Sequence, residues 1–256
     1  MDYIIGLITR WVPRTILQRF SPLVLKLLSL FYRGNKLTCP IEGKSYRKFL
    51  PYGRLKAREN ALCPGSMSLE RHRLLWLFLK DRTDFFKQKL TVLHVAPEKC
   101  FIKPFQQQHG ADYITADIES PLAMIKLDVH HIPFPDESFD VVICNHVLEH
   151  VEDDIKAMRE IFRVLKHGGW AILQVPFFYP VPKTTYEDPS VTDPKEREIK
   201  YGQSDHVRMY GEDFPERIHR AGFRVRMDAY CDELAEETRR KYALPESEMI
   251  PFCMKD

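Results

Sequence analysis

Residues Lys126 to Pro176 read KLDVHHIPFPDESFDVVICNHVLEHVEDDIKAMREIFRVLKHGGWAILQVP, and this stretch decides the fold. Residues 140–144 form an apolar run of the length expected for a buried strand. Apolar residues then recur at helical spacing over residues 152–165, and Gly168-Gly169 is expected to end that helix, because glycine tolerates a left-handed C-cap. A second apolar strand over residues 170–175 stops at Pro176. This order predicts a βαβ crossover whose two strands lie parallel.

The segments on either side predict the remaining strands of one sheet. The fold class is therefore α/β: a doubly wound, mostly parallel sheet of about seven strands with helices on both faces. The long stretch from residue 177 to about residue 212 shows no clear periodicity, and such a loop in a compact domain is often a lid. The further strands are expected at residues 90–95, 113–116, 124–127, 223–227 and 249–254, and further helices at 69–79, 211–221 and 233–242.

Three motifs in this framework resemble one enzyme family. The runs IPFPDESFD (residues 132–140) and NHVLEH (residues 145–150), followed later by DHVRMY (residues 205–210), resemble the class I S-adenosylmethionine (SAM)-dependent methyltransferases of the type 11 group. The resemblance covers roughly residues 90–230. It implies the strand order 3-2-1-4-5-7-6, SAM as the cofactor, and methyl transfer to an acceptor as the reaction.

The loop after the first strand departs from the family pattern. The family has a glycine-rich loop there, whose backbone approaches the methionine part of SAM. This chain has Ala96-Pro97-Glu98 instead, and His94 stands where the family has an acid. The resemblance places Ala96 against the cofactor. Glu98 is expected either to pair with the amino group of SAM or to cap the next helix.

The ends of the next two strands supply the other cofactor contacts that the resemblance implies. Asp117 takes the place of the acid that binds the ribose hydroxyls. Asp128 matches the residue that accepts a hydrogen bond from the adenine amino group, and Val129 offers its backbone to the ring. Both aspartates are also common turn formers, which is the structural alternative.

The fourth strand ends where the transferred methyl group and the acceptor would meet. Asn145 is assigned to the cofactor, and His146 is a candidate base. His206, in the later motif, is the second candidate. A base is needed only if the acceptor must first lose a proton, and a histidine at such a position is often only a packing residue.

Residues 1–35 are apolar and basic and form the first of three predicted parts of the chain. Pro13 and Pro22 divide them into short helices. No uncharged stretch approaches the roughly 20 residues that a membrane-spanning helix needs. The segment is expected either to lie in a membrane interface, or to pack on the catalytic domain or close a dimer.

Residues 36–68 form the second part and resemble a zinc ribbon that has lost ligands. Cys39 and Cys63 each begin a knuckle, but Glu42 and Ser66 replace the second cysteines. We therefore predict no metal site; His72 or Glu42 would be the replacement ligand if zinc were held. The third part, residues 69–256, is the methyltransferase domain.

The composition of the chain indicates which binding partners and which cellular compartment to expect. A net charge of +2 gives no basic patch of the kind that nucleic-acid binding needs, and six scattered cysteines favour a reducing cytoplasm. There is no clean signal peptide. We expect a small-molecule or lipid-linked acceptor and a cytoplasmic protein at the inner face of the membrane. The alternative is a non-catalytic, membrane-associated scaffold, which the altered loop and the depleted knuckles favour.

Overall fold

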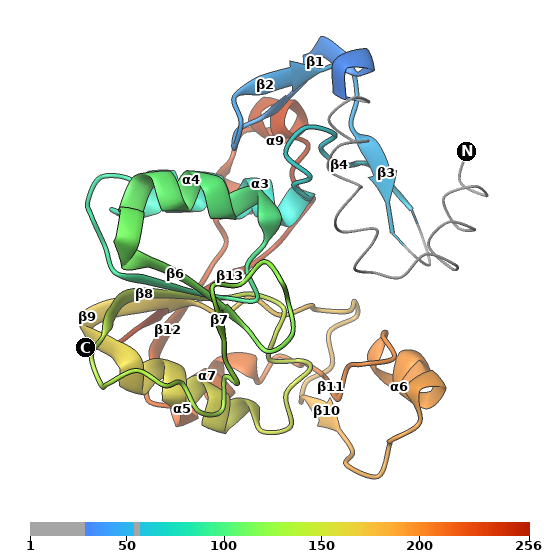
Figure 1. Cartoon of the computed structure of the whole chain (residues 1–256). Coiled ribbons are helices and arrows are strands. Elements are labelled where there is room, and N and C mark those ends of the chain that lie inside the picture. Colours follow the sequence, from blue (N-terminus) through green and yellow to red (C-terminus); the bar gives the residue numbers. More distant parts are fainter. Residues whose placement is uncertain (1–28, 54–56) are drawn as a thin grey trace. The chain divides into compact units, whose positions relative to one another are not determined.

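The computed structural model describes residues 29–53 and 57–256, which fall into two compact units (Figure 1). The first unit takes the chain up to Asp81 together with Cys231–Glu246. The second unit takes Arg82–Tyr230 together with Ser247–Asp256. The short helices predicted around Pro13 and Pro22 lie outside the described residues. No helix within the described ranges is long and apolar enough to cross a membrane.

The second unit is built on one seven-stranded sheet. Its strands are β5 (Val92–Val95), β6 (Tyr113–Asp117), β7 (Ile125–Lys126), β8 (Phe139–Cys144), β9 (Leu165–Ile172), β12 (Arg224–Asp228) and β13 (Ile250–Met254). They lie in the order β7-β6-β5-β8-β9-β13-β12, which is the predicted order 3-2-1-4-5-7-6. The strands β7 to β9 pair in parallel, whereas β13 is antiparallel to both of its neighbours. The predicted fold class is thus confirmed.

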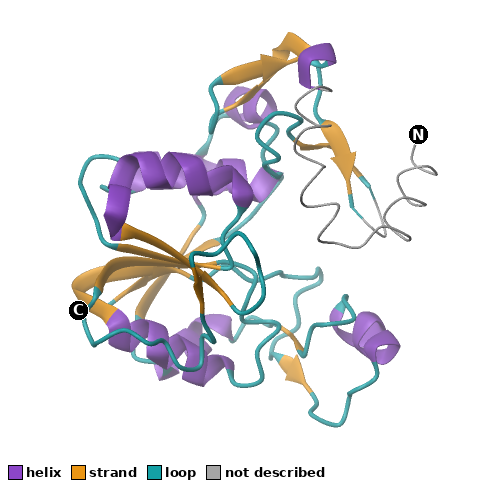
Figure 2. Ribbon diagram, viewed as in Figure 1, coloured by secondary structure: helices purple, strands orange, loops and turns teal. Residues whose placement is uncertain are grey.

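Helices cover both faces of this sheet. Figure 2 shows α4 (Lys99–His109) on one side and α5 (Asp154–Val164) and α7 (Phe214–Arg220) on the other. The helix α5 begins where the Asp153 side chain accepts the Lys156 backbone N–H. Its buried face carries Ile155, Met158 and Ile161, which pack into the core above the sheet. A ligand is expected at the carboxyl ends of β5, β6 and β8, which meet at one edge of the sheet.

The glycine pair at residues 168–169 does not end the helix as predicted. The helix stops at Val164, because Leu165 is already extended and pairs with Phe139 as the first residue of β9. Both glycines lie inside β9. A Cβ at Gly169 would come within 2.9 Å of the Asp140 carbonyl oxygen, so close strand packing, rather than a helix cap, requires glycine there.

The stretch from residue 177 to 211 contains regular structure that its lack of periodicity concealed. The strands β10 (Tyr186–Glu187) and β11 (Arg208–Met209) form a small antiparallel pair. Between them lies α6 (Pro194–Tyr201), which Asp193 caps by accepting the N–H groups of Lys195 and Glu196. Only Tyr201 of α6 is buried, so no apolar stripe marks this helix in the sequence.

In the residues that the structure describes, the first unit has two hairpins and flanking helices. The hairpins pair β1 (Arg33–Cys39) with β2 (Lys44–Tyr46) and β3 (Leu50–Tyr52) with β4 (Arg58–Leu62), and the helices are α3 (Glu70–Arg82), α8 (Tyr230–Glu233) and α9 (Glu236–Tyr242). The buried guanidinium of Arg73, in α3, holds this unit together: it donates to the carbonyl groups of Ala61, Ser68, Tyr242 and Ala243.

Candidate functional site

The carboxyl ends of β5 and β8 are joined by a network of polar side chains. Glu98 stands just before α4 and makes no capping bond to that helix. Its Oε2 lies 2.6 Å from Nε2 of the buried His94, and its Oε1 accepts a hydrogen bond of 3.1 Å from Asn145 Nδ2. His94 Nδ1 lies 2.8 Å from the hydroxyl of Tyr113, whose pKa is raised by burial. The network therefore crosses three neighbouring strands.

The backbone of this loop keeps the conformation that glycine would favour. Ala96 has φ +49, although it carries a side chain, and its N–H donates to the Ala116 carbonyl. The left-handed region is unfavourable for residues with a Cβ. The backbone at the end of β5 thus has a conformation that glycine would adopt more readily than alanine.

Asp117 lies at the end of β6, as the resemblance implies. Its Oδ1 accepts the N–H groups of Glu119 and Ser120, at 2.7 and 2.6 Å, which fixes the orientation of the carboxylate. A surface hollow of about 370 Å³ lies next to it, bounded by residues 117–120 and 123–126. Both backbone hydrogen bonds use Oδ1 of Asp117, so the other carboxylate oxygen, Oδ2, can contact a ligand. Forming the turn and binding a ligand are therefore compatible roles for this side chain.

Asp128 follows β7 and is half exposed. Its Oδ1 accepts the backbone N–H of His130 at 2.9 Å and lies 2.8 Å from His130 Nδ1. The backbone hydrogen bond is the main cause that lowers the pKa of this carboxyl. Val129, the next residue, is buried in the core of the second unit. Neither residue lines the hollow next to Asp117.

The two histidines predicted as bases are brought together around a carboxylate that the sequence analysis did not single out. Glu149 Oε1 lies 3.3 Å from Nδ1 of His146. The rings of His150 and His206 meet edge to face, with centroids 4.7 Å apart. His146 has φ +54, so its backbone is strained at the point where β8 ends. Burial lowers the pKa of His206.

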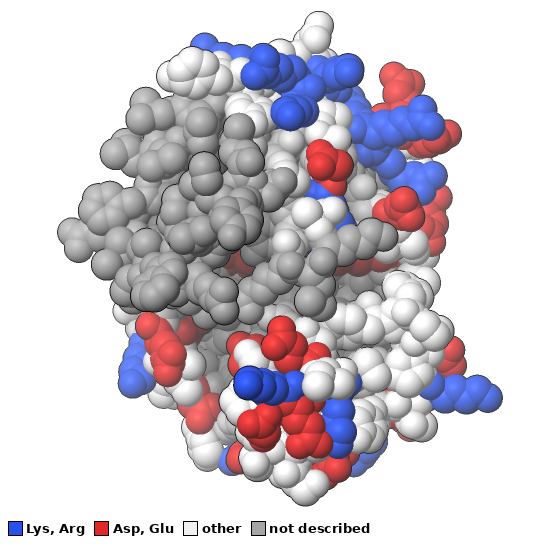
Figure 3. Space-filling view, turned by 90° about the vertical axis from the view of Figure 1, so that its right-hand side faces the viewer, with Lys and Arg blue, Asp and Glu red and all other residues white. Residues whose placement is uncertain are grey.

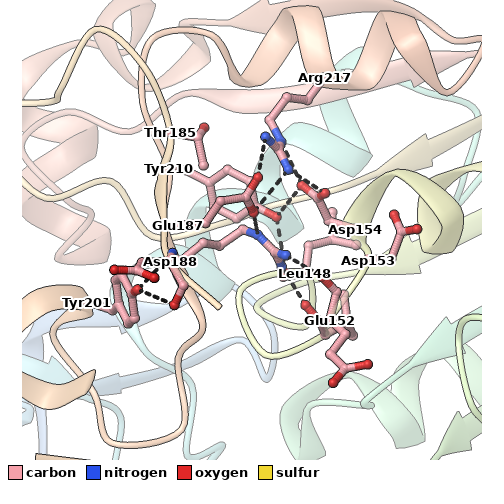
Figure 4. Close-up of polar contacts among 12 residues, drawn as sticks. Leu148, Glu152, Asp153, Asp154, Thr185, Glu187, Asp188, Tyr201, Tyr210 and Arg217 are labelled. Carbon is pink, nitrogen blue, oxygen red and sulfur yellow. Dashed lines mark hydrogen bonds and ion pairs between the residues drawn. The ribbon is translucent and has the colours of Figure 1, made fainter. Parts of the chain in front are cut away.

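A buried arginine holds the loop that carries this cluster, and Figure 4 labels three of its partners, Leu148, Glu152 and Glu187. Arg208, the arginine of DHVRMY, donates to the carbonyl oxygens of Leu148, Val151 and Glu152 at 2.6–2.7 Å. It also pairs with Glu187 of β10 at 2.8 Å. The motif therefore fixes the loop after β8 and attaches β10 to it.

A second arginine reinforces the same arrangement. Arg217 of α7 binds both oxygens of the buried Asp154 and reaches Glu187 at 3.1 Å. The hydroxyl of Tyr210 donates to Asp154 at 2.9 Å. Burial opposes ionisation of Asp154, but the hydrogen bond from Arg217 and the charges of both arginines hold the pKa of its carboxyl below the usual range.

The knuckle residues of the ribbon-like segment do come together in the first unit. Donor atoms of Cys39, Glu42 and Cys63 lie within 4.8 Å of one another. Cys63 Sγ donates to Glu42 Oε1 at 3.2 Å, and Cys39 Sγ lies 3.2 Å from Ser66 Oγ. His72 is not part of this group; its Nδ1 accepts the Leu69 backbone N–H. Hydrogen bonds between side chains thus link the two knuckles.

Residues 83–173 match the family model described as "Methyltransferase domain". The chain is 48% identical over 42 residues to an uncharacterized methyltransferase, YcgJ, of Bacillus subtilis, and 42% identical over 57 residues to the ubiquinone/menaquinone biosynthesis C-methyltransferase UbiE of Vibrio parahaemolyticus. These matches span 16% and 22% of this chain and 17% and 22% of those relatives, about a fifth of their length.

A solved structure confirms the fold over a longer range. An S-adenosylmethionine-dependent methyltransferase from Mesorhizobium loti superposes with a TM-score of 0.51 at 14% identity, covering 70% of this chain and 97% of that one. The family model matches residues 83–173, which contain the strands β5 to β9 of the sheet that the solved structure shares. Residues 83–173 therefore match a methyltransferase domain, and the second unit has the fold of a SAM-dependent methyltransferase.

Proposed function

We propose that this protein transfers a methyl group from SAM to a small-molecule or lipid-linked acceptor at the carboxyl ends of β5, β6 and β8. The observation that carries the proposal is the buried Asn145. Its Nδ2 is held by Glu98, whereas its Oδ1 has no hydrogen-bond partner among the described residues. A buried acceptor of this kind at a ligand-binding edge is explained by a donor on a ligand.

The polar groups at this edge fit the parts of SAM. The amino group of its methionine part needs acceptors, which Asn145 Oδ1 and the Glu98 carboxylate supply. The ribose hydroxyls need an acceptor that is already oriented, and Asp117 is fixed by its two backbone bonds. SAM, when bound, supplies a methyl group that its sulfonium has already activated, so the protein has mainly to align the acceptor and exclude water.

A proton acceptor stands next to this edge. His146 follows Asn145 directly, its Nδ1 faces Glu149, and its Nε2 is buried without a partner in the described part of the chain. A carboxylate on one ring nitrogen favours a proton there and leaves the other nitrogen as a base. In this proposal His146 takes the proton of an acceptor hydroxyl, and His206 belongs to the surrounding cluster.

The acceptor class follows from apolar side chains on the segment between β9 and β11. Tyr179 and Ile199 are 75% and 84% exposed, and Phe178 and Tyr186 are also exposed. Large apolar groups concentrated on one segment favour an apolar partner. The name of the relative UbiE, a ubiquinone/menaquinone biosynthesis C-methyltransferase, points to the same class of acceptor.

Contact with a membrane surface is part of the proposal. Five basic side chains are exposed on or beside the hairpin β1–β2, and Phe31, just before it, is 74% exposed: Arg33, Lys36, Lys44, Arg47 and Lys48. Figure 3 shows Lys and Arg side chains gathered at the top of the view, the end where Figure 1 draws this hairpin. Basic groups beside an apolar side chain favour an anionic lipid surface.

Titration calorimetry of the full chain with SAM and with its demethylated product tests the central claim. We expect one site for each ligand, with the two competing. Replacing Asn145 by Leu, which removes the buried Oδ1 but keeps the volume, should weaken both. If neither ligand binds to the folded wild-type protein, the proposed function is wrong.

A further inference from the structure

Two deeply buried side chains after β8 carry polar atoms that nothing in the described part of the chain satisfies. Glu149 is 1% exposed, and its Oε2 has no partner, whereas its Oε1 faces His146. His206 is 0% exposed, and its Nε2 also has none. An unsatisfied buried polar group destabilises the folded protein, and a charged one does so more strongly. A bound ion or water accounts for such atoms in native proteins.

Both residues belong to a compact donor set. One donor atom from each of Glu149, His150 and His206 lies within 4.8 Å of the others. The segments that carry them are fixed together, because the Val207 N–H donates to the Glu149 carbonyl at 2.9 Å. Ligand atoms around one tetrahedral zinc lie about 3.3 Å apart, given bonds of about 2.0–2.1 Å. His150 is exposed, so a small inward shift of its ring can bring its donor atom to the separation that a shared zinc ion requires.

Both histidines are oriented as ligands. His206 Nδ1 donates to the Tyr201 carbonyl at 3.1 Å, which leaves the lone pair on Nε2. His150 Nδ1 lies 3.2 Å from the Asp205 carbonyl and 3.5 Å from its carboxylate, which leaves Nε2 of that ring. Carbonyl and carboxylate groups on the outer nitrogen are the usual partners of a metal-binding histidine.

We propose that Glu149, His150 and His206 bind a divalent transition-metal ion, with zinc as the first choice. Two imidazoles and one carboxylate suit zinc and its neighbours, and three protein ligands leave a position open. Within the proposed function, that open position takes the hydroxyl oxygen of the acceptor. The bound hydroxyl becomes more acidic and gives its proton to His146, so the oxygen is ready to accept the methyl group.

Cobalt(II) replaces zinc in such sites and reports on its ligands. The full chain, stripped with a chelator, is titrated with Co²⁺ and followed by visible absorption and by calorimetry. We expect one equivalent with d–d bands and without the charge-transfer band of a thiolate ligand. A thiolate band would mean that Cys39 and Cys63 hold the metal instead, and a wild-type protein that binds no Co²⁺ would also overturn the proposal.

Two substitutions and two matched controls locate the ion. Glu149→Gln keeps the volume of a buried residue, and His150→Gln changes an exposed one, so at least the second protein should fold. Each should weaken Co²⁺ binding by about 100-fold or more, since loss of an outer partner alone costs about 10–100-fold. The controls Glu152→Gln and His167→Gln alter exposed side chains of the same types and should leave binding unchanged.

The same samples separate this inference from the proposed function. SAM affinity is measured on the metal-free and metal-loaded protein. Intact SAM binding with no Co²⁺ site would refute the metal site only. An intact Co²⁺ site with no SAM binding would refute the proposed function and leave the metal site in place.

Discussion

Glu98 Oε2 lies 2.6 Å from His94 Nε2, so a pair of side chains closes the loop between β5 and α4, where the family has a run of glycines. His94 is fully buried and cannot turn towards solvent. Asn145 completes the closure from β8. The loop is thus held by hydrogen bonds between side chains, and the backbone strain at Ala96 is the remaining cost of the substitution.

Ala96→Gly should stabilise the protein. The left-handed conformation at φ +49 costs an L-residue about 1–2 kcal/mol, which glycine would relieve. Glycine also gives the unfolded chain more conformational freedom, and this destabilises the folded protein by about 0.5–1 kcal/mol. The expected net gain is about 0.5–1 kcal/mol in the free energy of unfolding, measured by urea denaturation. Ala157→Gly, in the buried interior of α5, is the control and should lose about 1 kcal/mol. A loss of stability in both proteins would show that Ala96 is not strained.

Asp117→Asn should weaken SAM binding without unfolding the loop. Asparagine keeps an Oδ1 acceptor for the Glu119 and Ser120 amides but removes the charge that would meet the ribose hydroxyls. A charge-assisted hydrogen bond contributes about 1.5–3 kcal/mol, so calorimetry should show about 10- to 150-fold weaker binding. Asp112→Asn, at an exposed position before β6, is the control. Equal affinity in the two variants would remove Asp117 from the site.

The strands β5 and β8 were predictable because each is a short, mostly buried apolar run, and the family resemblance supplied the order of the sheet. Sequence alone could not show that Glu149 meets His206, since a tertiary contact, the backbone bond between Val207 and Glu149, brings them together. The helix α6 was missed because it buries little and so lacks an apolar stripe. The role of the glycines at 168–169 was mistaken because close strand packing and helix capping require the same residue type.

Arg208→Ala should cost far more stability than removal of an exposed arginine. It would take this donor from three loop carbonyl groups and from the Glu187 carboxylate, which still pairs with Arg217. Each buried carbonyl group left unsatisfied costs about 1–3 kcal/mol, so chemical denaturation would detect the loss. Arg224→Ala, whose partner Asp256 is exposed, should change stability little. Similar losses in the two proteins would contradict the role given to Arg208.

Stability should fall as the pH drops from about 6.5 to 4, in part because of His109. Burial lowers the pKa of this histidine from 6.5 to about 4, and its Nδ1 accepts the Leu90 N–H. Between these values the unfolded chain binds the proton and the folded protein does not, so the free energy of unfolding rises with pH. His109→Gln should flatten that slope, whereas His167→Gln, an exposed control, should not. Identical slopes in wild type and His109→Gln would refute the assignment.

Charge on the hairpin β1–β2 should set the affinity for acidic vesicles. Lys36 and Lys48 are exposed there, and each basic group near an anionic surface contributes about 1 kcal/mol. Lys36→Glu/Lys48→Glu should therefore reduce binding to phosphatidylserine-containing vesicles by roughly 30-fold or more in a co-sedimentation assay. The control Lys103→Glu/Lys195→Glu makes the same change in net charge on α4 and α6 and should bind as the wild type does.

The apolar N-terminal segment gives the second half of this test. Added salt screens the basic groups but not apolar burial, so binding of the full chain should weaken with salt without disappearing. A chain that begins at Asn35 lacks the apolar residues and should bind only at low salt. If the full chain stays in the supernatant with acidic vesicles at every salt concentration, residues 1–33 pack on protein rather than lipid, and the membrane contact is wrong.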